Sequence, residues 1–178
     1  RENDFRLTAE ELKAAITPKT KLLVLPFPNN PTGAIMRREH LEEIAEVLRG
    51  TDIMVLSDEI YAELTYGGER HVSIAEIDGM KERTIIVNGF SKTFAMTGFR
   101  VGYICANEGI VENLIKLHEN MIASVPEPMQ LAAVEAVYNG EKDVQEMVEY
   151  YDRNRHLIVD GLNRINGFSC LCPKGAFY

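Results

Sequence analysis

Three apolar runs in this chain each end in a compact polar cluster, and helical stretches separate the runs. They lie at 21–28 (KLLVLPFP), at 52–64 (DIMVLSDEIYAEL, apolar as far as its serine) and at 83–92 (RTIIVNGFSK). Continuous apolar runs of this length predict strands buried within a sheet, and RVGYICA at 100–106 predicts a fourth strand. Because strands alternate with helical stretches, the pattern indicates an α/β fold with a mostly parallel sheet and helices on both faces.

The first helical stretches carry local signals for where they begin and end. Thr8 and Glu11 have the spacing of a capping box at the start of AEELKAAI, in which each residue caps the backbone of the other. A second helix, predicted at 37–50, ends at Gly50, and glycine is common just past helix C-termini.

The second part of the chain has a different pattern. From about residue 108 onward it is helical as far as about residue 164, with a break near Gly140. We therefore predict a sheet-containing unit at 1–140. We expect residues 141–178 to form the start of a second, smaller unit.

The composition and charge of the chain exclude some kinds of binding partner. The formal net charge is −8 and no dense block of Lys and Arg occurs, so no nucleic-acid partner is expected. No apolar run approaches the roughly 20 residues that span a bilayer, so no membrane partner is expected. The three cysteines, Cys105, Cys170 and Cys172, cannot all pair with one another. A reducing compartment is therefore favoured, and we expect the protein to be cytoplasmic.

The two ends of the chain bear on its completeness. It begins with Arg1 and stops within KGAFY, an apolar segment that resembles a strand. Natural domains rarely end inside such a segment. We therefore expect the 178 residues to be part of a longer protein.

The polar clusters predict a common site at one edge of the sheet. Asn30 lies in PNNPTG after the first strand, Asp58 in SDEIY at the end of the second, and Lys92 in GFSK at the end of the third. In open α/β sheets, ligands bind outside the carboxyl ends of the strands. Any one cluster alone would read as a turn, but three on successive strand ends predict that these side chains converge.

The residue types at this edge suit one cofactor. Partial desolvation disfavours the charged form of a lysine, so the Lys92 amine becomes nucleophilic and suited to a Schiff base with pyridoxal 5′-phosphate (PLP). Asp58 is placed to keep the pyridine nitrogen protonated, and Tyr61 and Asn30 are candidate partners of the phenolic oxygen. Arg100 supplies a cation for the phosphate, and Ser91 supplies a hydroxyl.

These segments together resemble a known family. NNPTG, SDEIYAEL, SKTFAMTGFRVGY and PKGAFY are similar to the class I/II aminotransferases of PLP fold type I, and FAMTGFR resembles the aspartate and aromatic branch in particular. The resemblance extends over essentially all 178 residues. It implies that 1–140 is the second half of the PLP-binding large domain, and that 141–178 is the linking helix and the start of a smaller α+β domain.

The resemblance also implies a role for each candidate residue. Lys92 would bind the cofactor aldehyde and later move the substrate proton, Asp58 would pair with the pyridine nitrogen, and Tyr61 would hydrogen-bond the phenolic oxygen. Asn30 would share that oxygen and reach the substrate α-carboxylate. Arg100 would bind the phosphate with help from Ser91. In one departure, Gly89 stands three residues before the lysine, where many relatives have a phosphate-binding Ser or Thr.

The implied activity is amino-group transfer between an amino acid and a 2-oxo acid, in amino-acid metabolism or biosynthesis, by a homodimer. The missing substrate-binding groups of a longer protein would leave the 178 residues inactive alone. Two alternatives stay open: a PLP-dependent carbon–sulfur β-lyase, which shares these residues, and an aminotransferase-like effector domain of a transcription regulator.

Two other sequence motifs resemble functional sites, but their details argue against that interpretation. HENMI at His118 lacks the second histidine of a zinc-protease helix, so no metal site is expected. Asp58 and Glu59 are adjacent carboxylates, but neighbouring residues on a strand point to opposite faces, which argues against paired-carboxylate hydrolysis.

Overall fold

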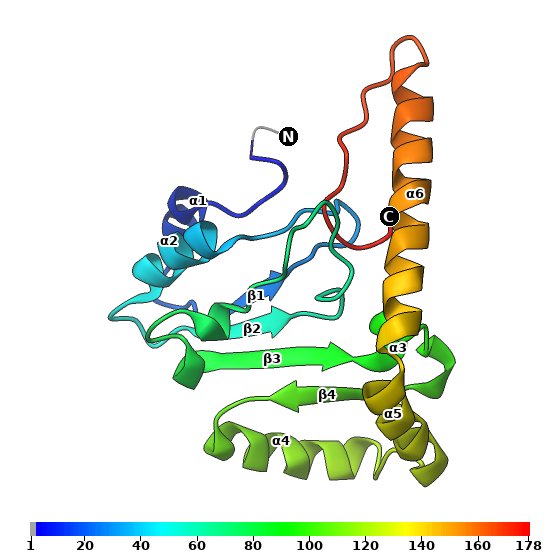
Figure 1. The fold of residues 1–178 in the computed structure, drawn as a ribbon. Coiled ribbons are helices and arrows are strands. Elements are labelled where there is room, and N and C mark those ends of the chain that lie inside the picture. Colours follow the sequence, from blue (N-terminus) through cyan, green and yellow to red (C-terminus); the bar gives the residue numbers. More distant parts are fainter. Residues whose placement is uncertain (1–2) are drawn as a thin grey trace.

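A single four-stranded sheet forms the centre of the protein in a computed structural model, which describes residues 3–178. The strands lie side by side in chain order: β1 (Leu22–Pro26), β2 (Met54–Asp58), β3 (Thr84–Gly89) and β4 (Gly102–Cys105) (Figure 1). β1, β2 and β3 run parallel, and β4 runs antiparallel to β3. The predicted α/β fold with a mostly parallel sheet is confirmed.

The helices follow the predicted order along the chain. Thr8 caps the first of them, because its side chain accepts a hydrogen bond from Glu11 N (3.2 Å) while Glu11 Oε2 accepts one from Thr8 N (3.0 Å). In the described part of the chain the α-helices are α1 (Ala9–Ala15), α2 (Arg38–Leu48), α3 (Phe90–Thr93), α4 (Glu108–Met121), α5 (Glu127–Asn139) and α6 (Glu141–Asn163), and the short 3-10 helices are η1 (Ile74–Glu76), η2 (Lys81–Arg83) and η3 (Thr97–Phe99).

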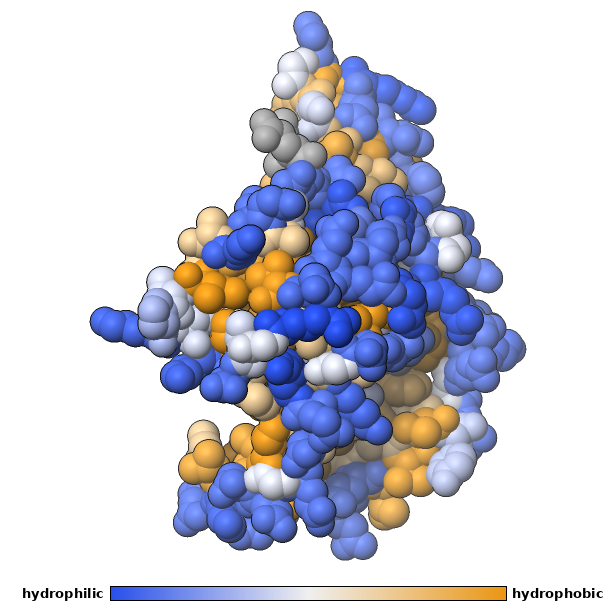
Figure 2. Space-filling view, turned by 90° about the vertical axis from the view of Figure 1, so that its left-hand side faces the viewer, coloured by the Kyte–Doolittle hydropathy of each residue, from blue (hydrophilic) through white to orange (hydrophobic). Residues whose placement is uncertain are grey.

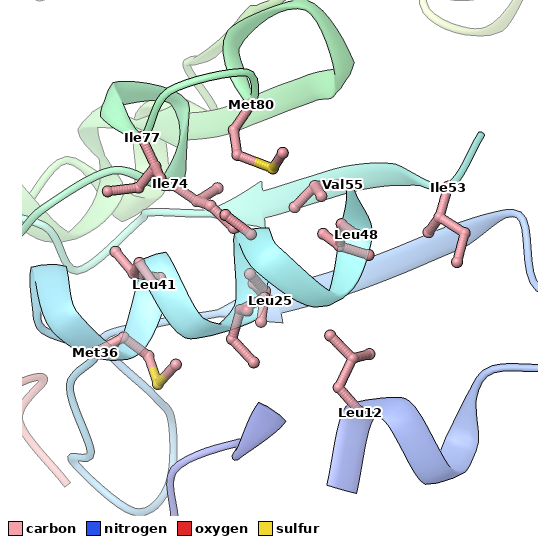
Figure 3. Close-up of a cluster of buried hydrophobic side chains, with 12 residues drawn as sticks. Leu12, Leu25, Met36, Leu41, Leu48, Ile53, Val55, Ile74, Ile77 and Met80 are labelled. Atoms are coloured by element: carbon pink, nitrogen blue, oxygen red, sulfur yellow. The ribbon is translucent and has the colours of Figure 1, made fainter. Parts of the chain in front are cut away.

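The main hydrophobic core lies between α1, α2 and η1 on one side and the first two strands on the other (Figure 3). Ile44 and Leu48 of α2 and Val55 of β2 are completely buried there. Burial of one such side chain stabilises the fold by about 1.5–3 kcal/mol. This layer holds β1 and β2 in place, and therefore also the loops that leave their ends.

The opposite face of β1 is less covered. Leu25 points into the core, whereas Leu22 and Val24 remain 46% and 53% exposed. Alternate residues of a strand face opposite ways, so the described residues cover β1, an edge strand, on one face only. Apolar patches also interrupt the hydrophilic surface in the view of Figure 2.

The long helix α6 stands past the carboxyl ends of the parallel strands (Figure 1). Its residues Met147, Val148 and Tyr151 pack against a second buried cluster, which includes Tyr61 and Leu64 from the segment after β2. This packing connects α6 to the edge of the sheet where the candidate residues lie. None of the helices within residues 3–178 is long and apolar enough to cross a membrane.

The strand-like segment at the end of the chain does not form a strand. Gly175 makes an isolated antiparallel bridge with Thr65, and Ala176 N donates to Leu64 O (2.9 Å). The segment therefore follows the chain after β2 instead of joining the sheet, and it places Phe177 and Tyr178 next to Tyr61.

Candidate active site

The register of the sheet brings the three strand ends to one edge. Pro26, the last residue of β1, lies opposite Asp58, the last residue of β2, and Asp58 lies opposite Val87 of β3. The loops that carry Asn30, Tyr61 and Lys92 leave from these positions. The predicted convergence at the carboxyl edge therefore follows directly from parallel pairing.

Lys92 lies on a one-turn helix and not at the end of the strand itself. β3 ends at Gly89, and α3 begins at Phe90. At Gly89 a β-carbon would lie 3.0 Å from both Gly102 Cα and Val101 O, a contact that would push β4 away. The departure noted in the sequence thus agrees with the structure, because a Ser or Thr side chain at this position would require the backbone of residues 101 and 102 to shift by a few tenths of an ångström.

The Lys92 side chain is half-buried among aromatic rings. Its Nζ lies 5.8 Å from the ring centroid of Tyr61 and 5.5 Å from that of Phe177, within the range of a cation–π attraction. Among residues 3–178, no carboxylate lies within 4.0 Å of Lys92 Nζ. The amine is therefore held by ring faces and is not tied up in an ion pair.

Tyr61 lies close to three other candidate residues, Asn30, Asp58 and Lys92. It is 4% exposed, and its hydroxyl donates to Tyr178 Oη at 3.2 Å. Burial raises the pKa of Tyr61 well above its usual value, the Tyr178 hydroxyl and the Asp58 charge raise this pKa further, and the Asn30 amide lowers it. Tyr61 therefore keeps its proton at neutral pH, and in this structure that proton is donated to Tyr178 Oη.

A hydrogen bond within the turn that follows β2 fixes the Asp58 side chain. Its Oδ1 accepts a hydrogen bond from Ile60 N at 3.2 Å, and the side chain is half-buried. Glu59, the first residue after the strand, is 5% exposed, and its carboxylate accepts from the hydroxyl of Ser57, the neighbour of Asp58 on the opposite face. The expectation that these two carboxylates do not form a pair agrees with this arrangement.

Ser91 lies within α3, and Arg100 lies in the connection between α3 and β4. Arg100 is exposed and adopts a left-handed backbone conformation (φ 56°), and its Nη1 donates to Thr97 O at 2.8 Å. Thr97 Oγ1 in turn donates to Ser91 O at 3.0 Å. Within residues 3–178, no hydrogen bond or ion pair joins the Arg100 or Ser91 side chain to the other candidate residues.

Two residues at this edge had no role predicted from the sequence. Phe177 lies against Lys92 Nζ, and Tyr178 accepts the hydrogen bond of Tyr61. Both reach the site because Gly33 packs directly on the C-terminal segment, where Lys174 N and Gly175 N each donate to Gly33 O at 2.9 Å. The only local signal was the aromatic pair that ends KGAFY.

Replacing Gly33 with alanine should therefore destabilise the protein and displace this segment. The new β-carbon would lie 2.2 Å from Pro173 Cβ and 2.9 Å from Gly175 O. Gly67→Ala is the matched control, because Gly67 has nearly the same φ (68° against 66°) and no atom within 4 Å of the added carbon. Urea denaturation should show Gly33→Ala less stable than the control by about 1–3 kcal/mol. Equal losses in the two variants would contradict the close packing.

Comparisons with known proteins agree with this architecture. The family model described as Aminotransferase class I and II matches residues 1–178. The chain is 45% identical over 179 residues to aromatic-amino-acid aminotransferase 2 of Thermococcus litoralis, covering 99% of this chain and 46% of the relative. It is 44% identical over 179 residues to an aspartate aminotransferase of Bacillus subtilis, covering 99% of this chain and 45% of the relative.

Solved structures give the same result. An aromatic aminotransferase from Pyrococcus horikoshii OT3 matches with a TM-score of 0.94 at 45% identity, over 98% of this chain and 47% of that one. An aspartate aminotransferase from Thermus thermophilus with maleate matches with a TM-score of 0.92 at 38% identity, over 98% of this chain and 46% of that one. The chain spans less than half the length of these relatives. With the family model matched along its whole length, the chain belongs to the class I and II aminotransferases.

Proposed function

We propose that the protein containing this chain uses PLP to transfer an amino group between an amino acid and a 2-oxo acid. The observation that carries the proposal is the register of Asp58 opposite Val87, because it brings a carboxylate, the Tyr61 phenol and the Lys92 amine to one sheet edge. Membership of the aminotransferase family supports the reaction.

The donor set at this edge fits PLP. An amine not engaged in an ion pair suits its aldehyde, a carboxylate suits its ring nitrogen, and a protonated phenol beside an amide suits its phenolic oxygen. The exposed Arg100 guanidinium likewise has no carboxylate within 4.0 Å among residues 3–178, as a phosphate ligand would require. When bound, PLP supplies an aldehyde that captures amines and a cationic ring that accepts electron density from the substrate Cα.

Each residue then has a distinct task. Lys92 Nζ would hold the cofactor covalently and, once released, would move the proton of the substrate Cα. The Asp58 carboxylate would keep the ring nitrogen protonated. The Tyr61 hydroxyl, which donates to Tyr178 Oη in this structure, would turn to donate to the phenolic oxygen. Asn30 assists at that oxygen and contacts the substrate α-carboxylate. Arg100 binds the phosphate, and Ser91 assists it.

Aspartate or an aromatic amino acid is the proposed substrate class, on the strength of the relatives' names. We also propose a homodimer, which is supported by the exposed apolar side chains Ile115, Leu117 and Met121 on α4; such surfaces favour association. The division into a large-domain part at 1–140 and the start of a small domain at 141–178 is part of the same proposal, since α6 begins at Glu141.

The test is half-transamination of the natural protein that contains this chain. The protein loaded with PLP is mixed with single amino acids in the absence of any 2-oxo acid, and cofactor absorbance is followed. We expect aspartate or an aromatic amino acid to convert the cofactor to its amine form and to release the matching 2-oxo acid. Absence of conversion with every amino acid would contradict the proposal. Release of pyruvate and a thiol from a β-thioether amino acid, without amine-form cofactor, would favour the β-lyase.

Replacing Tyr61 with phenylalanine should weaken the cofactor site without dismantling it. The variant keeps the buried ring but loses the hydroxyl, which Tyr61 retains in its protonated form at neutral pH. One hydrogen bond contributes about 0.5–1.5 kcal/mol, so turnover should fall about 2- to 10-fold and the dissociation constant of PLP should rise. Tyr150→Phe, at a 56% exposed tyrosine of α6, is the control. Unchanged turnover in Tyr61→Phe would remove Tyr61 from the site.

A further inference from the structure

Glu59 is a buried carboxylate that lies between two residues of the proposed site, Asp58 and Tyr61, in the sequence, and its polar contacts are with other residues. Its side chain is only 7% exposed. Its Oε1 accepts hydrogen bonds from Ser57 Oγ at 3.0 Å and from Ser73 Oγ at 2.5 Å. Its Oε2 lies 3.0 Å from His71 Nε2. Both carboxylate oxygens are therefore engaged, by groups from β2, from the loop before η1 and from the start of η1.

The cluster favours an ionised Glu59. Burial raises the pKa of this carboxyl, but the polar contacts from His71, Ser73 and Ser57, together with the charge of His71, outweigh burial and leave the pKa below its usual value. His71 Nε2 is itself buried and lies 3.0 Å from Glu59 Oε2, although the two are not aligned for a regular hydrogen bond. A buried carboxylate is retained only where such partners compensate for its lost hydration.

The cluster anchors the end of β2 to the main core. Ser73 caps η1, where its Oγ accepts from Ala75 N at 3.3 Å and its backbone N donates to Glu76 Oε1 at 3.1 Å. The next residue, Ile74, is 1% exposed and belongs to the main core. Glu59 therefore connects the strand end to a segment that is itself held rigidly.

The Glu59 backbone continues this connection into the site. Its N donates to Val87 O at 2.8 Å, and its carbonyl accepts from Ala62 N at 2.9 Å. These bonds fix the peptides on either side of the residue, and so set the directions of the side chains at 58 and 61. Catalytic groups need supporting contacts of this kind, because misplacement by about 1 Å can cost about 100-fold in rate.

We propose that Glu59 is a positioning residue for the cofactor site: through Ser57, His71 and Ser73 it holds the turn after β2 so that Asp58 and Tyr61 present their polar groups to PLP. Glu59 itself touches neither cofactor nor substrate. The inference rests on the proposed function. The competing possibility is that the cluster contributes to folding stability alone.

The test compares Glu59→Leu with Glu59→Gln in the natural protein. Leucine removes the acceptor for both serine hydroxyls, whereas the glutamine amide oxygen can still accept them. The dissociation constant of PLP, the visible circular dichroism of the bound cofactor, kcat, KM and the urea midpoint are measured for each variant. For Glu59→Leu we expect PLP affinity and kcat to fall at least about 10-fold, with KM within about threefold of wild type, because Asp58 acts in the transition state. Glu59→Gln should restore PLP affinity to within about threefold.

Thr84→Val is the matched control for lost stability. Thr84 is 2% exposed at the far end of β3, and its hydroxyl donates to Met80 O at 2.8 Å. This variant should lower the urea midpoint but leave PLP affinity, circular dichroism and kcat unchanged. If Glu59→Leu lowers the urea midpoint as Thr84→Val does, with PLP affinity and kcat unaltered, the positioning role is overturned.

A milder variant covers the case in which Glu59→Leu does not fold. Ser73→Ala removes a single hydroxyl from the cluster and should weaken PLP binding about two- to fivefold, with an altered circular dichroism; unchanged values would overturn the inference. PLP binding by the wild-type protein distinguishes a failure of the proposed function from a failure of the proposed role of Glu59. If it fails to bind PLP the proposed function is wrong, whereas normal wild-type binding with unaffected Glu59→Leu or Ser73→Ala contradicts only the role of Glu59.

Discussion

Replacing Lys92 with alanine should abolish the covalent, borohydride-reducible bond between the protein and PLP and reduce turnover to background. The proposed site has one amine for two tasks, covalent attachment of the cofactor and proton transfer at the substrate Cα. General acid–base catalysis alone contributes about 10²- to 10⁴-fold to a rate. Loss of the Lys92 amine should therefore cost at least that factor.

The fold should survive this substitution. Lys92 is half-buried on α3, and its Nζ contacts only ring faces, those of Tyr61 and Phe177, among the contacts recorded for residues 3–178. A cation–π contact of this kind contributes about 0.5–2 kcal/mol. Circular dichroism and the urea midpoint of the variant should remain close to those of the wild type.

The measurement is borohydride reduction of the PLP-loaded natural protein, followed by mass spectrometry of the peptide that contains residue 92. Lys81→Ala is the matched control, because Lys81 is exposed on η2 at the opposite end of β3. The control should keep both the bond and the turnover. A reducible bond that persists in Lys92→Ala would show that another amine holds the cofactor.

Asp58→Asn should keep PLP bound but lose most of the turnover. The asparagine oxygen can still accept the hydrogen bond that Asp58 Oδ1 takes from Ile60 N at 3.2 Å, so the turn should keep its shape. A neutral amide, however, cannot hold the ring nitrogen in its protonated form. Removal of one preorganised electrostatic group typically costs about 10²- to 10³-fold in kcat, and we expect a loss of that size.

Steady-state kinetics and a PLP titration of the same preparation check this prediction. Asp52→Asn is the control, because Asp52 is exposed just before β2, at the amino end of the same strand. It should behave like the wild type in both measurements. Near-normal kcat in PLP-saturated Asp58→Asn would exclude Asp58 as the partner of the ring nitrogen.

Local patterns in the sequence determined the elements of this fold. The apolar runs mark β1, β2 and β3, and the capping box of Thr8 and Glu11 marks the start of α1. These features are readable because strand burial and helix capping depend on residues a few positions apart. Parallel pairing of successive strands then implied that the polar clusters after them share one edge, and the register of Pro26, Asp58 and Val87 agrees.

The surroundings of the candidate residues were decided by tertiary structure. No local pattern announced that Phe177 would reach Lys92, or that Tyr178 would meet the Tyr61 hydroxyl, since 117 positions separate the two tyrosines. KGAFY resembles a strand in the sequence, but within residues 3–178 Gly175 forms an isolated bridge with Thr65. The absence of a side chain at Gly33 lets Pro173 of the same segment approach closely.

Glu59 is the clearest case of a residue whose contacts could not be predicted from the sequence. From the sequence it is only the neighbour of Asp58, and strand alternation predicts no more than that the two point opposite ways. Ser73 and His71 lie 14 and 12 positions further along the chain, and they meet its carboxylate only once η1 packs on the core. Apolar periodicity can be read one segment at a time, whereas the partners of a buried charge are set by which distant segments the completed core brings together.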